Sequence, residues 1–152
     1  MCRRRATLLV VVFVISLCDG CAAPSVQMYD GPALTTDKQA VVKVAKRNRT
    51  TLRGTLGIVR VDGSMTVNTA EYLINPKWAA SVTVLPGKHT ILVKRESAMF
   101  YSIGEFWFVA EPSKEYVVNA DDRGYGVRMW IEDETTGKPV GGILGSQDEP
   151  PN

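Results

Sequence analysis

The sequence contains little of the chemistry on which many catalytic and metal sites depend. Histidine occurs once, at His89, and cysteine three times, at Cys2, Cys18 and Cys21. Zinc sites use clusters of cysteine and histidine, and histidine is the most frequent general base in enzymes. The composition therefore predicts no catalytic residue, no metal and no cofactor, and it favours a structural position for His89 at the start of a strand.

The first 21 residues have the pattern of an export signal. Three arginines at 3–5 precede a largely apolar run over 6–17, and Gly20 and Cys21 follow. A run of this length fits a secretory signal, whereas a membrane-spanning helix needs about 20 apolar residues. The pattern resembles the signal of bacterial lipoproteins, in which glycine or alanine precedes a cysteine that is diacylated and becomes the new N-terminus. Cys18 stands where such signals usually have leucine.

The resemblance implies that residues 1–20 are removed and that Cys21 carries fatty acyl chains such as palmitate. Because Ala22 follows instead of aspartate, it also implies sorting to the outer membrane in a Gram-negative cell, with the domain facing the periplasm. An alternative is ordinary signal-peptidase cleavage after Ala22, with Gly20 as the other small residue. That cleavage would yield a secreted protein without an anchor.

The charge of the exported chain is close to balanced. Of 18 basic and 16 acidic residues, three arginines and Asp19 precede Cys21, so 15 of each remain. Such a chain has no net field that would attract nucleic acid, and we expect no nucleic-acid partner. The basic residues concentrate between 38 and 60 and the acidic ones between 105 and 134. Either the two groups pair across a sheet, or the basic edge meets anionic lipid or lipopolysaccharide.

The exported chain divides into three parts. Residues 21–39 contain proline and glycine without a clear period and are predicted to form an extended tether. Residues 40–145 are predicted to form one β-domain, and the polar segment 146–152 a disordered tail. With Cys2 and Cys18 removed, an intramolecular disulfide is excluded, so the domain depends on its hydrophobic core.

The domain has the pattern of an all-β protein. Short runs of branched and aromatic residues alternate with turn residues every 8 to 12 positions or so, which predicts an antiparallel two-sheet sandwich of about seven strands. Hairpins are predicted at Asp62–Gly63, Pro86–Gly87 and 111–114. The expected strands are 41–45, 56–61, 81–85, 89–94, 105–110, 115–120, 125–132 and 139–144, and a short helix is expected within 68–74.

Two stretches of the domain resemble a known module. Residues 59–63 (VRVDG) and 85–93 (LPGKHTILV) are similar to the turns and strands of PEGA-type β-sandwich modules of exported bacterial proteins. The resemblance covers residues 56–95. It implies the sandwich fold and assigns no catalytic residue.

The aromatic residues suggest a binding surface. Alternation along the strands places Trp107 and Trp130 on outward faces, where they are candidates for contact with a sugar, a peptide or a membrane interface. The alternative is that the tether or the segment 72–78 covers both.

We therefore expect a lipid-anchored cell-envelope protein that acts as a binding or structural module, without enzymatic activity. Its partners would be the membrane, through the anchor, and an envelope protein or glycan. The alternative is a hydrolase, secreted or anchored, that uses carboxylates drawn from Glu105, Asp121, Asp122 and Glu132.

Overall fold

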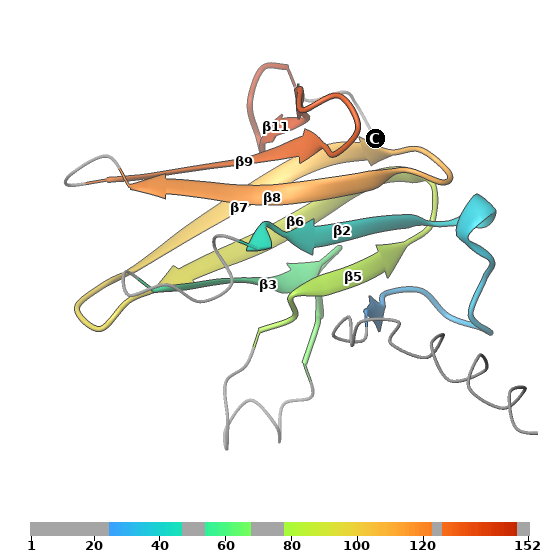
Figure 1. The fold of residues 1–152 in the computed structure, drawn as a ribbon, viewed down its shortest axis with the longest axis horizontal. Helices are drawn as coiled ribbons and strands as arrows, with labels where there is room; N and C mark the ends of the chain where they lie inside the picture. Colours follow the sequence, from blue (N-terminus) through green and yellow to red (C-terminus); the bar gives the residue numbers. More distant parts are fainter. Residues whose placement is uncertain (1–24, 47–53, 68–77, 123–125, 149–152) are drawn as a thin grey trace, which may run out of the picture.

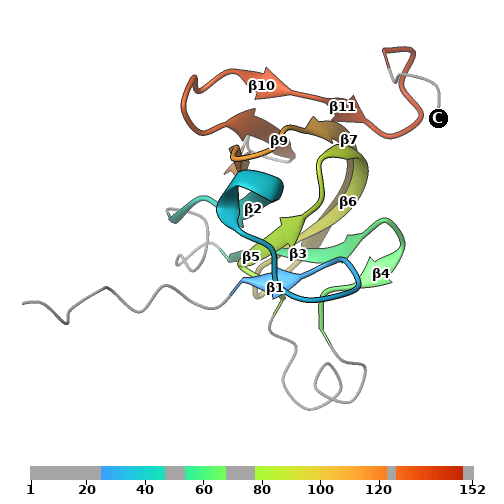
Figure 2. The same ribbon diagram turned by 90° about the vertical axis from the view of Figure 1, so that its right-hand side faces the viewer.

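The computed structural model describes residues 25–46, 54–67, 78–122 and 126–148. These residues form two facing β-sheets (Figure 1), so the prediction of an all-β sandwich is confirmed. One sheet has the order β1-β5-β2-β8-β9-β10 and the other β11-β7-β6-β3-β4. Seen from the end (Figure 2), β10 and β11 run across one edge of the sandwich.

Seven of the strands in the described residues have four residues or more, in agreement with the predicted number. They are β2 (Ala40–Val44), β3 (Thr55–Val61), β5 (Ser81–Val84), β6 (Gly87–Glu96), β7 (Tyr101–Ala110), β8 (Glu115–Asp122) and β9 (Val127–Asp133). Four more have two residues each: β1 (Val26–Gln27), β4 (Ser64–Met65), β10 (Pro139–Val140) and β11 (Gly142–Ile143). The pairings are antiparallel except for β1 with β5 and β2 with β8, which are parallel.

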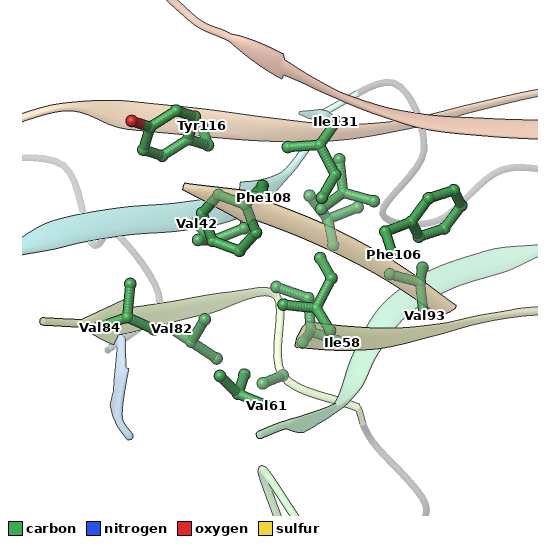
Figure 3. Close-up of a cluster of buried hydrophobic side chains, with 14 of the residues drawn as sticks. Val42, Ile58, Val61, Val82, Val84, Val93, Phe106, Phe108, Tyr116 and Ile131 are labelled. Atoms are coloured by element: carbon green, nitrogen blue, oxygen red, sulfur yellow. The ribbon is translucent and has the colours of Figure 1, made fainter. Parts of the chain in front are cut away.

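The core lies between the sheets and follows from the alternation of apolar residues. In β2, for example, Ala40, Val42 and Val44 are buried while Lys43 is not, as a strand with one inward face requires. Side chains from both sheets meet in this layer (Figure 3). The largest fully buried ones include Val42, Ile58, Ile91, Phe108 and Ile131.

Two predicted hairpins are wrong. β5 and β6 belong to different sheets, because β5 pairs with β1 and β2 while β6 pairs with β3 and β7. In the same way β7 and β8 do not pair, and the segment 111–114 carries the chain from one sheet to the other. Both connections have turn chemistry, with Gly87 and Ser113 at positive φ, but they are arches between layers. The two-residue turn Asp62–Gly63 does join β3 to β4, with φ values of 48° and 79°.

The returning strand predicted at 139–144 is split. β10 pairs with β9, and β11 pairs with β7 in the other sheet. Gly141 lies between them with a φ of 68°, and a Cβ there would stand 1.9 Å from the carbonyl oxygen of Trp107. A glycine therefore permits the change of sheet at this point.

The predicted tether also differs from the structure in its described part. Val26 and Gln27 form β1 against β5, and a short 3-10 helix spans Thr36–Lys38. Tyr29 donates a hydrogen bond to the side chain of Gln39 at 2.8 Å. Residues 25–39 thus belong to the folded domain instead of spacing it from an anchor. The signal, residues 1–20, and the helix expected within 68–74 lie outside the described residues.

Within the described residues, no helix has the length and apolar character required to cross a membrane.

Candidate functional site

The end of the β6–β7 hairpin carries an exposed apolar cluster. Four of the eight large apolar side chains that are exposed in the described residues lie there, within five positions of one another. Their exposed fractions are 93% for Met99, 56% for Phe100, 65% for Tyr101 and 54% for Ile103. Single exposed apolar residues are normal, but a contiguous group marks an interaction site. We call these four residues the hairpin patch.

The turn that presents the hairpin patch is held by a serine. The amide of Ser97 donates to the carbonyl oxygen of Phe100 at 2.9 Å, and the hydroxyl of Ser97 donates to the same oxygen at 2.9 Å. The amides of Met99 and Phe100 in turn donate to the Ser97 hydroxyl oxygen, at 3.4 and 3.2 Å. Because serine side chains stabilise turns in this way, Met99 and Phe100 are held out into solvent by a defined turn.

The alternation of β7 extends the patch along the strand. Phe106 and Phe108 point into the core, so Tyr101 and Ile103 stand on the outer face of the sheet. That face normally carries polar residues. Tyr101 and Ile103 therefore continue the exposed apolar segment from the turn onto the outer face of the sheet.

A lysine lies between two aromatic rings beside the hairpin patch. The Lys94 ammonium is 5.2 Å from the ring centroid of Trp78 and 5.2 Å from that of Tyr101, within cation–π range. It also lies 3.4 Å from a carboxylate oxygen of Glu96. Trp78 reaches this position because Gly57 on β3 has no side chain, and a Cβ there would stand 2.2 Å from the Trp78 Cβ. The patch thus has an aromatic and cationic border.

The predicted tryptophan surface is divided by the fold. Trp107 is on the outer face of β7 and Trp130 on the outer face of β9, in different sheets. Each is half-buried, and each indole N–H has a partner. Trp107 donates to the hydroxyl of Ser146 at 3.2 Å, and Trp130 donates to Glu132 at 2.9 Å. The two tryptophans therefore do not join in one surface.

His89 lies near the start of β6, the position that the sequence predicts for it. Its Nδ1 lies 2.6 Å from an Asp62 carboxylate oxygen, and its Nε2 lies 2.7 Å from the carbonyl oxygen of Leu85. Asp62 also accepts a hydrogen bond from the Thr90 amide at 2.8 Å. Both ring nitrogens are engaged, and the ring fastens the β3–β4 turn to the connection between β5 and β6.

Of the four carboxylates of the alternative hydrolase, Glu105 lies in a different sheet from the other three. Glu105 lies on the exposed face of β7, whereas Asp121 and Glu132 belong to β8 and β9 in the other sheet. Glu132 is engaged by Trp130, as above, and the side chain of Asp122 is outside the described residues. In the described part of the chain, no three His, Cys, Asp or Glu side chains gather as a metal site would require.

The outer face of the other sheet carries an ion-pair cluster. The Lys43 ammonium lies 2.5 Å from Glu115 and 2.6 Å from Glu134. Partial burial acts to lower the pKa of Lys43, but the hydrogen bonds and charges of the two glutamates outweigh it and raise that pKa above its usual value. Hydrogen bonds with Glu134 and Lys43 lower the pKa of Glu115. Lys43 thus pairs with the acidic residues across the sheet, one of the two arrangements expected from the charge distribution.

The exposure of the hairpin patch does not follow from the alternation of apolar residues in the sequence. The expected strands 89–94 and 105–110 leave residues 99–103 outside the strand pattern, which therefore says nothing of their exposure. The available signal was the segment 97–100 (SAMF), which connects two strands without glycine, proline, asparagine or aspartate. Apolar residues in such a connection are unusual.

Cys21 lies outside the described residues, so the lipid anchor stays a prediction. No protein-family model matches the chain, and no curated protein or solved structure matches it either.

Proposed function

We propose that this protein is a lipid-anchored cell-envelope protein that acts as a non-enzymatic binding module through its hairpin patch. The anchor is Cys21, exposed as the new N-terminus after residues 1–20 are removed. The protein is held in the outer membrane with the domain on the periplasmic side. The partner is a component of the envelope.

The observation that carries the binding role is the exposed position of Met99, Phe100, Tyr101 and Ile103 on a turn held by Ser97. Methionine and aromatic residues are enriched at the centres of protein interfaces, and a patch on a defined turn loses little conformational entropy when it binds. The export pattern before Cys21 supports the location. Glu105 lies in a different sheet from the other three carboxylates, and Asp121 and Glu132 are four positions apart along the pairing of β8 with β9, which disfavours the hydrolase.

Two measurements test the proposal separately. Intact mass spectrometry of the exported protein is expected to find a diacylated Cys21, and Cys21→Ala should abolish partitioning into detergent. A free N-terminus at Ala23 would instead identify the secreted form and refute the anchor.

The binding role is tested by photo-crosslinking in intact cells. A photoreactive residue in place of Met99 should give adducts with an envelope component, while the same residue in place of Ile143, exposed on β11, should not. Equal labelling from the two positions would remove the assignment of binding to the hairpin patch.

A further inference from the structure

We propose that the hairpin patch docks on the lipid bilayer, so that the membrane that holds Cys21 is also the surface that the domain binds. This inference rests on the lipid anchor of the proposed function. It names the partner of the hairpin patch as the interfacial region of the bilayer, where headgroups meet acyl chains.

The first argument is the short chain between the anchor and the domain. The hydroxyl of Ser25 lies 3.1 Å from that of Ser81, and β1 begins at the next residue. Only residues 22–24 separate Cys21 from Ser25. Four extended residue steps span at most about 14 Å. The edge of the sheet formed by β1 is therefore held close to the membrane surface, and the domain cannot stand away from it.

The second argument is the side of the molecule on which the hairpin patch lies. In Figure 1, β1 and the connection between β6 and β7 lie at opposite ends of the long axis but both in the lower half of the molecule, while β9 and β11 lie at the top. A surface that lies below the molecule in this view would meet β1 at one end and the turn of the β6–β7 hairpin at the other. Ile143 on β11 is on the opposite side.

The third argument is chemical. Met99, Phe100 and Ile103 offer apolar side chains that can enter the boundary of the acyl chains. Tyr101 and Trp78 belong to the two residue types enriched at membrane–water interfaces. Lys94, between their rings, has a long apolar stem and a charged head, the combination that positions lysine at this depth. A lipid surface matches all three features of the patch and its border.

The test measures the depth of the hairpin patch in the acylated, full-length exported protein. Cys2 and Cys18 leave with the signal and the sulfur of Cys21 carries the lipid, so Met99→Cys provides a single free thiol. The protein is labelled there with an environment-sensitive fluorophore and incorporated in vesicles of phosphatidylethanolamine and phosphatidylglycerol. Ile143→Cys is the matched control, since it is also largely exposed but lies away from β1.

We expect a blue shift of the emission at position 99, and quenching there by brominated lipids, with neither effect at position 143. Emission at position 99 that stays as in water would overturn the inference. Strong quenching at both positions would overturn it as well, because the domain would then lie on the membrane without a preferred face.

A second measurement does not depend on the anchor. The exported chain with Cys21→Ala is mixed with the same vesicles and sedimented. The double variant Met99→Ser/Phe100→Ser should reduce the bound fraction at limiting lipid by about tenfold, whereas Ile143→Ser should leave it unchanged. Because the replaced side chains are exposed, circular dichroism should show both variants folded. Equal vesicle binding by the double variant and its parent would refute the docking.

The outcomes separate this inference from the proposed function. A diacylated Cys21 together with protein adducts from position 99 would retain the proposed function and overturn the lipid as partner. A concentration-dependent dimer that the double variant abolishes would do the same, with a second copy as partner. A chain without acyl groups on Cys21 would remove the proposed anchor and this inference with it.

Discussion

The replacement Tyr116→Phe tests how the chain is held where it crosses from one sheet to the other. Tyr116 is 2% exposed in β8. Its hydroxyl oxygen accepts a hydrogen bond from the amide of Glu111 at 2.9 Å and donates one to the carbonyl oxygen of Val109 at 3.3 Å. Both partners belong to the end of β7 and the following turn. The Tyr116 side chain, from the sheet that contains β8, therefore holds the end of β7, which belongs to the other sheet.

The replacement removes only the hydroxyl. The ring keeps its edge contact with Phe108, whose centroid is 5.3 Å away. Each hydrogen bond contributes about 0.5–1.5 kcal/mol net, so Tyr116→Phe should lower the free energy of unfolding by about 1–3 kcal/mol. For a domain of this size, that corresponds to a fall in Tm of about 4–12 °C.

The assay is equilibrium unfolding in urea, followed by tryptophan fluorescence, with a thermal melt beside it. Tyr101→Phe is the matched control because it makes the same chemical change on the exposed hairpin patch, and it should stay within about 0.5 kcal/mol of the parent. If Tyr116→Phe were as stable as Tyr101→Phe, the hydroxyl would not fasten the crossing, and the reasoning would be refuted.

Three further predictions concern other parts of the fold. Gly141→Ala should lower the free energy of unfolding by more than Gly137→Ala, for which we expect a loss of about 1 kcal/mol. Both glycines have positive φ, but only a Cβ at Gly141 would meet the Trp107 carbonyl. Equal urea midpoints for the two variants would contradict this prediction. Hydrogen bonds to the Asp133 carboxylate lower its pKa. The ionised carboxylate therefore stabilises the folded state above the ordinary aspartate pKa, and this stabilisation is lost as the pH falls through the lowered pKa. Asp133→Asn should then be less stable than the parent at pH 7, and the difference should shrink as the pH falls through the lowered pKa. A difference that stays constant on acidification would count against the reasoning. Lys43→Met should lower the free energy of unfolding by no more than about 1 kcal/mol, and by less at ~1 M salt. A loss of stability that does not depend on salt would show that the ion pairs are not its cause.

The strands were predictable because their pattern is local. Alternation identifies an inward face without knowledge of the partner strand, as the burial of Val127, Met129 and Ile131 in or against the core illustrates. The turn Asp62–Gly63 was predictable for a similar reason, because the turn requires positive φ at both positions and these two residues can adopt it.

The two arches were not predictable from the same signals. Pro86–Gly87 and the segment 111–114 have turn chemistry suited to a hairpin, and a buried strand face does not reveal the sheet to which the strand belongs. That choice depends on contacts between distant residues. Tyr116, for instance, meets the carbonyl of Val109 only after its sheet has packed on the other one.

The candidate site divides in the same way. Sequence alone determined the export pattern that ends at Cys21, the scarcity of histidine and cysteine, and the strand period of the domain, because these depend on composition and on neighbours along the chain. Only the tertiary structure decided that Trp107 and Trp130 occupy different sheets, that residues 25–39 belong to the domain, and that Met99 and its neighbours are exposed. The sequence of a strand specifies which of its side chains lie on each of its two faces. Which strand pairs with it, and whether another segment covers one of its faces, depends on contacts between residues that are distant in the sequence.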